Sequence, residues 1–517
     1  MSRTKKTTVN SIVGIICTII NSIFSFVLRA LFIRLLGLEY AGVNTLFSDI
    51  LSILNLADLG FNNAILFRLY KSISNSDDKA TQIYLTLYKK ICYVVGTIIG
   101  VAGLLCIPFL ERLIKNKPSF PEPLWSLYII VLATTVTNHF INYKSILIIA
   151  QQERYIVTII QYTCIFLRNL LQILSLAIYG NIYFYLLSGF VTTIIQGVLN
   201  GIVSYRRYHV TWNSKERVPK DERKKIAKDV GALAVYKLCR IVDATIDTFL
   251  ISKFIAVTVT AIYGSTMMLL NALHELLGVF NDGMIASIGN LHTSSSNKDI
   301  SKVFYESIHF TFLLYGISTA TLIALISQFT NWWIGYSLSL GAIWLVMINF
   351  YMYGIGMNIA TYRNAMGIFV KGWKRPAITA ALNLFFSIIL IRKIGISGTI
   401  LGTIIARLMT GTWYDPYIVI KYGFGEKPYK YYLRYILYTF IVLFASTIHI
   451  FLFNNILSKD LSFIILIKNG FVYLLVSVLI IFTFGFLFPE QKALINRIKV
   501  LLNSIIIQNA RKKSSGY

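Results

Sequence analysis

Long hydrophobic runs, separated by short charged or turn-forming segments, make up most of this sequence. A helix needs about 18 or more mostly apolar residues to cross a bilayer, and about 14 runs reach that length. They lie at 10–34, 41–67, 84–110, 124–150, 155–179, 182–205, 230–254, 258–282, 304–327, 340–362, 376–393, 396–420, 432–453 and 463–488. The pattern predicts an all-α membrane protein with about 14 transmembrane helices.

The second hydrophobic run carries a continuous line of polar residues within residues 39–70. On a helix with about 100° per residue, these residues share a third of the circumference. They are Asn44, Thr45, Ser48, Ser52, Asn55 and Asn62, with Asp49 and Asp58 nearby. Each could simply bond a neighbouring helix. Together they favour the polar wall of a cavity.

The fourth and fifth runs repeat this polar pattern. Asn138 and Asn142 align in the fourth run, and Gln172 follows Arg168 by one turn in the fifth. We assign these residues to the same cavity wall as Asn44, Ser48, Ser52, Asn55 and Asp58.

Several charged residues lie inside the predicted spans, where a charge at the bilayer centre costs about 2.5–3.5 kcal/mol. Arg29 ends a polar stripe in the first span, although its outer position also allows it to extend to the membrane surface. Arg168 lies near the middle of the fifth span, which favours a cavity role over a structural ion pair. Arg68 and Arg363, near the ends of their spans, are expected to be interfacial anchors.

The seventh and eighth spans carry charges of both signs. Lys237, Arg240, Asp243 and Asp247 occupy one broad face, where they either neutralise one another or form a protonation or cation switch. His274 and Glu275 suggest a proton relay in the eighth span. The ion-coupling candidates are Asp243, Asp247, His274, Glu275 and Asp282. Arg407 lies close to a face formed by Thr399, Thr403 and Thr410.

The composition of the 517-residue chain agrees with a polytopic membrane protein. It is 56% hydrophobic and 14% charged, with a mean hydropathy of +0.66 and a net charge of +27. The basic residues gather between the hydrophobic runs, as expected for cytoplasmic loops. This distribution favours membrane orientation over nucleic-acid binding and places both termini in the cytoplasm.

The strongest polar break, residues 206–228, divides the chain into two halves. We predict an N-terminal six-helix bundle at 1–205, a basic cytoplasmic linker at 206–228 and a C-terminal six-helix bundle at 229–421. Two additional transmembrane helices follow at 422–488. A basic amphipathic tail at 489–517 is expected to lie on the inner leaflet.

Signals for enzymatic or metal chemistry do not appear in the sequence. The five cysteines stand singly in or beside apolar runs, which indicates no disulfide framework and no metal site. Phosphate-binding glycine loops, H-E-x-x-H motifs and nucleophile elbows are absent from the sequence. We therefore expect a transporter without a cofactor, driven by an ion or substrate gradient.

Residues 36–79 resemble polysaccharide repeat-unit flippases of the Wzx type, within the MOP/MATE-like exporter superfamily. The segments that carry the resemblance are LGLEYAGVNTLF, LNLADLG and LYK before a charged loop. The resemblance implies a V-shaped, MATE-like pair of six-helix bundles followed by two extra helices. It also implies alternating-access transport of an undecaprenyl-diphosphate-linked oligosaccharide from the inner to the outer leaflet of a bacterial cytoplasmic membrane.

Such a flippase is expected to have a cationic cavity for the diphosphate. Arg29, Arg168, Lys237, Arg240 and Arg407 are the residues able to supply it. Coupling to H⁺ or Na⁺, as in an antiporter, is expected at the acidic candidates. Expected partners are membrane lipids and the polymerase and glycosyltransferases of capsule, O-antigen or other exopolysaccharide synthesis.

Three alternatives stay open at this stage. A MATE-like drug or cation exporter would favour an acidic cavity, and a lipid II flippase would share the diphosphate. A membrane-embedded polysaccharide polymerase is expected to have a large external loop, which the short loops disfavour.

Overall fold

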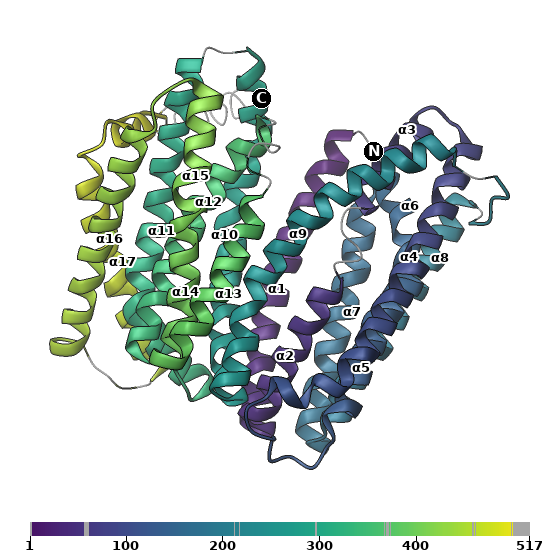
Figure 1. Cartoon of the computed structure of the whole chain (residues 1–517), viewed down its shortest axis with the longest axis horizontal. Helices are drawn as coiled ribbons and strands as arrows, with labels where there is room; N and C mark the ends of the chain where they lie inside the picture. The colour runs from purple at the N-terminus through teal and green to yellow at the C-terminus, as the bar shows by residue number, and fades with distance from the viewer. Residues whose placement is uncertain are drawn as a thin grey trace, which may run out of the picture. The chain divides into compact units, whose positions relative to one another are not determined.

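The computed structural model describes residues 3–55, 61–210, 212–216, 218–294, 297–366, 368, 372, 374–457, 460, 462–497 and 499. Every regular element in these residues is a helix (Figure 1). The chain divides into two compact units, Met1–Ser265 and Thr266–Tyr517. The predicted all-α class is therefore confirmed.

Unit 1 contains the helices of the first half of the chain and the start of α10. They are α1 (Arg3–Leu36), α2 (Leu38–Leu54), α3 (Phe61–Ser74), α4 (Asp78–Cys106), α5 (Leu124–Ile141), α6 (Ser145–Ala150), α7 (Arg154–Leu174), α8 (Ile182–Tyr208), α9 (Lys220–Phe254) and α10 (Val257–Ser294). Side chains cap the N-termini of two of these helices. Asp77 accepts from the Ala80 amide at 2.9 Å before α4, and Asn181 accepts from the Tyr183 amide at 2.8 Å before α8.

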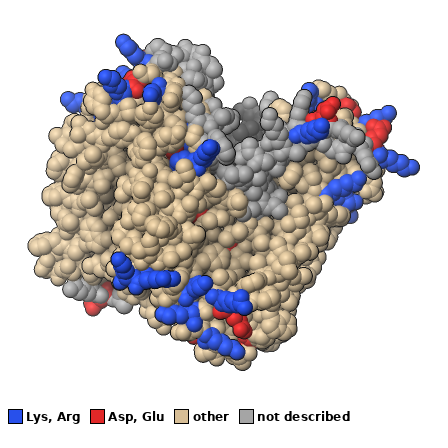
Figure 2. Space-filling view, in the orientation of Figure 1, with Lys and Arg blue, Asp and Glu red and all other residues tan. Residues whose placement is uncertain are grey.

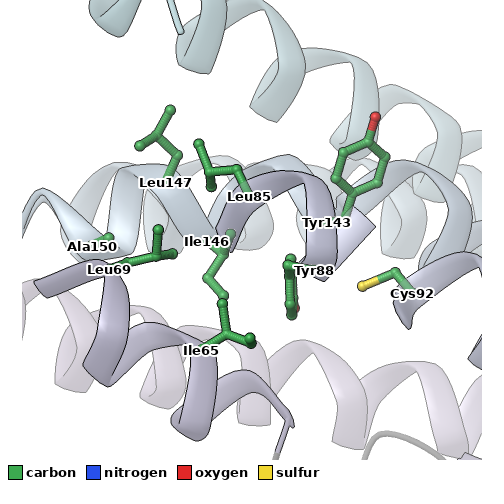
Figure 3. Packing of buried hydrophobic residues seen from close by; sticks show 9 residues of the cluster. All are labelled: Ile65, Leu69, Leu85, Tyr88, Cys92, Tyr143, Ile146, Leu147 and Ala150. Atoms are coloured by element: carbon green, nitrogen blue, oxygen red, sulfur yellow. The ribbon is translucent and has the colours of Figure 1, made fainter. Parts of the chain in front are cut away.

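A hydrophobic cluster holds α3, α4 and α6 together (Figure 3). Its members are Ile65, Leu69, Leu85, Tyr88, Cys92, Tyr143, Ile146, Leu147 and Ala150, all buried. Trp212, from the segment between α8 and α9, packs edge-on against Tyr143 with ring centroids 5.0 Å apart. The amide of Ser214 donates to Thr86 Oγ1 at 2.9 Å. The described part of the predicted linker 206–228 therefore packs against unit 1.

Unit 2 contains the rest of α10 and seven further α-helices. They are α11 (Asn297–Ile334), α12 (Leu340–Ala365), α13 (Arg375–Ile394), α14 (Ile396–Met409), α15 (Gly411–Ile418), α16 (Tyr429–Asn455) and α17 (Phe463–Gly485). A π-helical segment, Val419–Phe424, continues α15.

Glycines allow α13 and α14 to pack closely. Gly395 connects the two helices with a φ of 62°, which favours glycine. A Cβ at Gly398 would lie 2.3 Å from the Leu390 carbonyl oxygen, and one at Gly402 would lie 2.4 Å from Ser387 Oγ. Beside them, Thr403 Oγ1 donates to Asn383 Oδ1 at 3.0 Å. Small residues and polar bonds hold this pair, as is common between membrane helices.

Ten helices among the described residues are long and apolar enough to cross a membrane. Figure 2 shows few charges on the surface between the two ends of these helices. The membrane prediction is therefore supported, whereas the count of about 14 spans is not confirmed. Two predicted spans are divided. The run 41–67 is split between α2 and α3, and the run 396–420 is broken at Thr410, whose φ and ψ are −128° and −92°.

The division of residues 39–70 corrects one sequence interpretation. Asn55 ends α2, and Asn62 lies on α3, where its Oδ1 accepts from the Tyr88 hydroxyl. Asn62 therefore does not belong to the polar line on α2, because α2 ends at Leu54 and Asn62 lies on α3.

The boundary between the units also differs from the predicted position at 206–228. It lies within α10, between Ser265 and Thr266. Contacts that α9 and the start of α10 make with α2 and with Arg29 account for their place in unit 1.

The first residues of the predicted tail pack against helices of unit 2. Glu490 and Gln491 are buried. Glu490 accepts from Arg434 of α16 at 2.6 Å, and Arg497 pairs with Glu306 of α11 at 2.6 Å. Ion pairs therefore dock residues 489–497, while residues 500–517 lie outside the described residues.

Candidate functional site

Arg29 on α1 is held by neutral oxygen atoms from two other helices. Its Nε donates to Ser265 Oγ at 2.9 Å, and its Nη2 donates to the Ala261 carbonyl at 3.0 Å and to Thr45 Oγ1 at 3.2 Å. Its Nη1 reaches the Ala41 carbonyl at 3.5 Å. These partners fix the guanidinium but leave its charge without a carboxylate among the described residues.

Two glycines permit this arrangement by bringing α2 and α10 together. A Cβ at Gly42 would lie 1.9 Å from the Val257 carbonyl oxygen. One at Gly264 would lie 2.9 Å from Thr45 Cγ2. Only the missing side chains allow Thr45 and Ser265 to approach Arg29 from both sides.

Arg168 on α7 lies near the same place. Its Nε is buried and has no hydrogen-bond partner among the described residues. Both arginines lie in the neighbourhood of Tyr185 on α8. The Tyr185 ring packs against Phe32 with centroids 4.6 Å apart, and its carbonyl accepts from Gln172 Nε2 at 3.3 Å. Tyr185 is therefore a central residue of the site that the sequence pattern did not reveal.

Two guanidinium groups thus converge in unit 1 without a compensating carboxylate among the described side chains. Asn21 Oδ1 and Asn169 Nδ2 are also buried without a partner in the described structure. Arg29 and Arg168 are partly buried, and a cation withdrawn from water is stabilised by an anion, by water or by a shifted protonation state. Because Arg stays protonated, this arrangement suits an anionic ligand with several oxygen atoms.

The polar residues predicted as a cavity wall separate into three groups. On α2, Ser48 and Ser52 donate to the carbonyls of Asn44 and Ser48 at 2.9 and 2.8 Å, so both hydroxyls bond within their own helix. Asn55 Oδ1 lies 3.1 Å from His139 Nε2. Gln172 is buried and positions Tyr185, as described above.

A chain of amides forms the third group. Asn142 donates to Asn138 Oδ1 and accepts from Asn200 Nδ2 at 3.1 Å. Asn138 is exposed and Asn200 is buried. The predicted wall residue Asp58 lies outside the described residues.

The charged residues of α9 differ in their exposure. Arg240 is exposed, Asp243 is partly buried and Asp247 is buried. Asp247 Oδ2 accepts from the Tyr263 hydroxyl at 3.0 Å. The described ion pairs of unit 1 join Arg68 to Glu222 and Arg207 to Glu153, and neither includes Arg240. The side chain of Lys237 lies outside the described residues.

Arg407 belongs to unit 2. Its Nη1 donates to Asn349 Oδ1 at 2.6 Å. His274 and Glu275 lie on α10 in the same unit, with Glu275 exposed. Of the predicted cationic residues, unit 1 contains Arg29 and Arg168, and unit 2 contains Arg407. The side chain of Asp282 lies outside the described residues.

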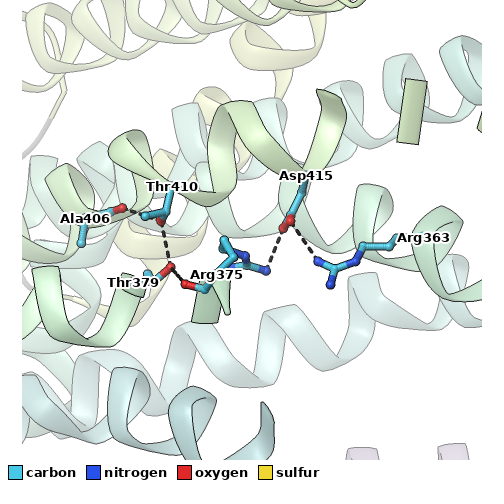
Figure 4. A network of polar contacts seen from close by, with 6 residues as sticks. All are labelled: Arg363, Arg375, Thr379, Ala406, Thr410 and Asp415. Carbon is cyan, nitrogen blue, oxygen red and sulfur yellow. Dashed lines mark hydrogen bonds and ion pairs between the residues drawn. The ribbon is translucent and has the colours of Figure 1, made fainter. Parts of the chain in front are cut away.

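A charged network in unit 2 was missed in the sequence (Figure 4). Arg363 donates to Asp415 Oδ1 at 2.9 Å, and Arg375 lies 2.7 Å from Asp415 Oδ2. The expectation that Arg363 anchors the membrane surface is wrong, because its side chain is only 4% exposed. The partner lies 52 residues away in the chain, so helix periodicity gave no signal.

Solved structures of membrane transporters have a similar architecture. The structure is similar to the lipid II flippase MurJ in an inward closed conformation, with a TM-score of 0.68 and 14% identity over 90% of this chain and 98% of that chain. For an inward-facing multidrug resistance MATE family transporter of the MOP superfamily, the TM-score is 0.62 and the identity is 14%, over 78% of this chain and 97% of that chain. A MOP superfamily transporter from Pyrococcus furiosus, whose binding pocket has reversed polarity, is similar with a TM-score of 0.56. The identity is 13%, over 83% of this chain and 98% of that chain.

These likenesses and the apolar helices define a multi-pass membrane protein with the fold of MOP superfamily transporters. Residues 7–285 match the family described as "Polysaccharide biosynthesis protein". The match spans more than half of the 517 residues, so the chain belongs to that family. The resemblance noted in the sequence is thereby confirmed. A comparison with curated protein sequences found no match.

Proposed function

We propose that the protein is a flippase for undecaprenyl-diphosphate-linked oligosaccharide repeat units. It moves them by alternating access from the inner to the outer leaflet of a bacterial cytoplasmic membrane. The family, the transporter fold and the uncompensated arginines of unit 1 support this proposal. The charge of Arg29 and Arg168 is the observation that carries it.

The arginine pair matches the chemistry of a diphosphate. Arg29 is held by four neutral oxygens, so its guanidinium is oriented before a ligand arrives. Arg168 offers a buried Nε whose hydrogen bond is unmade in the described structure. Guanidinium groups bind phosphate oxygens through paired hydrogen bonds. A diphosphate would therefore satisfy both cations, while the lipid tail stays in the bilayer.

Energy for directional transport would come from H⁺ or Na⁺ in this proposal. Asp243, Asp247, His274, Glu275 and Asp282 are the coupling candidates. Asp247 and Tyr263 connect α9 to α10 through a buried hydrogen bond, so a change in the charge of Asp247 would alter this helix contact. Glycosyltransferases that make the substrate and a polymerase that consumes it would be the functional partners.

Two alternatives predict different substrates. Lipid II has the same diphosphate on a different headgroup, so the arginine pair alone does not separate it from an oligosaccharide lipid. An exporter of organic cations would be repelled by Arg29 and Arg168. The cationic site therefore favours a lipid diphosphate over a drug cation.

Transport in vesicles of known composition tests the proposal. The purified chain is reconstituted with a fluorescent undecaprenyl-diphosphate oligosaccharide, and a membrane-impermeant quencher reports the fraction in the outer leaflet. Arg29→Gln and Arg168→Gln should each slow flipping by about 10- to 100-fold, because a charge-assisted hydrogen bond is lost. Arg206→Gln, at an exposed position near the end of α8, is the matched control and should flip at the original rate.

Equal flipping by the wild type, Arg29→Gln and Arg168→Gln would remove the arginine pair from the mechanism. Flipping of lipid II but of no oligosaccharide lipid would assign the protein to the alternative substrate. Absence of lipid flipping together with uptake of an organic cation would contradict the proposal.

A further inference from the structure

A group of aromatic side chains surrounds His274 in unit 2. The centroid of the His274 ring is 4.3 Å from that of Phe350, 4.7 Å from that of Tyr353 and 5.5 Å from that of Tyr315. His274 Nδ1 also lies 3.2 Å from the Tyr315 hydroxyl oxygen. Gly354 admits Tyr315, since a Cβ there would lie 2.2 Å from the ring. Packing from α10, α11 and α12 therefore fixes the orientation of these rings.

Arg407 of α14 completes the group. Its Nη1 donates to Asn349 Oδ1 at 2.6 Å, and its guanidinium carbon lies 5.5 Å from the Tyr353 ring centroid. Both contacts come from α12, one turn apart. The amide and the ring therefore orient the guanidinium, and the cation–π contact adds to the attraction.

The same face of α12 offers open space. Asn349, Tyr353 and Gly356 recur at spacings of four and three, so they lie along one side of the helix. Asn349, Tyr353 and Arg407 are partly exposed, and Gly356 is exposed. A Cβ at Gly356 would meet no atom within 4 Å. The surface next to Tyr353 thus has room for a ligand, whereas Phe350 and Tyr315 are buried behind it.

The chemistry of this surface differs from that of the arginine pair in unit 1. Asn271 and Glu275 are exposed on α10, three residues before and one residue after His274. Amide, carboxylate and guanidinium groups pair with hydroxyls through hydrogen bonds. An aromatic face attracts the weakly positive C–H groups of a sugar ring. Glu275 would repel a diphosphate, and the polar groups would exclude a lipid tail.

We infer that this surface is a sugar-binding subsite formed by Asn349, Tyr353 and Arg407, with the exposed Asn271 and Glu275 on α10, the helix whose His274 packs against Tyr353. The inference rests on the proposed function, since the ligand is a pyranose ring of the lipid-linked oligosaccharide. Tyr353 packs against the C–H face of the ring, and the polar side chains bond its hydroxyls. Unit 1 then recognises the diphosphate, and unit 2 recognises the sugar.

Binding measurements with and without a sugar test this division. The full chain in lipid nanodiscs is titrated with undecaprenyl diphosphate and with the same lipid carrying one glucose, galactose or N-acetylglucosamine. The wild type should bind at least one sugar-bearing lipid about tenfold more tightly than the bare lipid. Tyr353→Leu should abolish this difference, whereas Tyr353→Phe should retain it because the ring face remains.

Gly356→Leu is an independent variant, because it fills the open space without removing any contact of Tyr353. It should also abolish the preference for a sugar and leave binding of the bare lipid unchanged. Tyr336→Leu makes the same change at an exposed tyrosine after α11 and should behave as the wild type.

The outcomes separate the inference from the proposed function. A sugar preference that survives both Tyr353→Leu and Gly356→Leu overturns the subsite. Equal affinity of the wild type for the bare lipid and all three sugar-bearing lipids also overturns it, while the arginine site for the diphosphate stands. Failure of the wild type to bind any of the four lipids contradicts the proposed function itself.

Discussion

Arg363 of α12 and Asp415 of α15 form a buried ion pair, with 2.9 Å between Nη1 and Oδ1. Arg375 at the start of α13 lies 2.7 Å from the second oxygen of the same carboxylate. Its guanidinium also lies close to Gly411, the first residue of α15. A Cβ at Gly411 would lie 3.2 Å from Arg375 Nη1. One carboxylate therefore joins three helices and pairs with two arginines, which leaves the three groups with a net charge of +1.

The first prediction concerns this network. Asp415→Asn should lower the free energy of unfolding by about 3–5 kcal/mol, because it leaves buried arginine charge uncompensated. Arg375→Met should cost less, since the Arg363–Asp415 pair remains neutral. Thermal unfolding of the purified variants in detergent gives their order of stability. Glu216→Gln removes an exposed carboxylate and serves as the control. Equal melting temperatures for Asp415→Asn and Glu216→Gln would show that the network does not stabilise unit 2.

Hydrophobic runs predicted the helical class and the membrane location correctly, because each run reports only its own residues and their length. They did not predict where helices break. Thr410 ends α14 inside an apolar run, and its Oγ1 bonds the Ala406 carbonyl at 2.6 Å and Thr379 Oγ1 at 2.8 Å. The second bond comes from α13, so only tertiary structure explains how the break is satisfied.

The second prediction concerns the close contact of α13 and α14. Gly398→Ala should destabilise unit 2 by about 1–3 kcal/mol, because the new methyl group would overlap the Leu390 backbone and force the helices apart. Gly341→Ala is the matched control. A Cβ at position 341 would meet only Ser397 Oγ, at 3.9 Å, an ordinary contact distance. Thermal unfolding should separate the two variants, and equal stability would contradict the close packing.

Polar side chains attach α17 to α11 in unit 2. Asn469 Nδ2 donates to Gln328 Oε1 at 2.9 Å, and Gln328 Nε2 donates to the Tyr473 hydroxyl at 3.2 Å. Thr321 Oγ1 donates to Ser477 Oγ at 3.0 Å two turns further along. The last transmembrane helix, α17, is therefore bonded to α11 by specific contacts in addition to apolar packing.

The third prediction tests this attachment. Asn469→Leu should lower stability by about 1–2 kcal/mol, because an interhelical hydrogen bond is lost in an apolar environment. Asn455→Leu is the control, since that exposed amide bonds only the Phe451 carbonyl of its own helix. Unfolding curves in detergent should shift for Asn469→Leu alone. A larger shift for Asn455→Leu would place the stabilising contact elsewhere.

The candidate site could be predicted only in part, because the hydrophobic pattern marks charged residues but gives no signal for other residues of the site. Arg168 stood out in the sequence because a charge deep in an apolar run is costly. Tyr185 carried no such signal, since tyrosine is common in apolar runs, yet it lies in the neighbourhood of both Arg29 and Arg168. Arg407 was grouped with Arg29 and Arg168 because all three are charged residues inside predicted spans, and this grouping stays a prediction since Arg407 lies in the other unit.

The last prediction concerns residues 489–497, which dock on α11 and α16. Arg434 pairs with Glu490, Arg497 pairs with Glu306, and His309 Nε2 lies 2.7 Å from Gln491 Oε1. A chain that ends at Phe488 would leave Arg434 and Glu306 without these partners. It should unfold at a lower temperature, with a loss of about 3–5 kcal/mol for the buried pair. A chain that ends at Lys499 retains all three contacts and should melt like the full chain. If the shorter chain were as stable as the longer one, the docked segment would contribute nothing to unit 2, and the buried Glu490 would need another explanation.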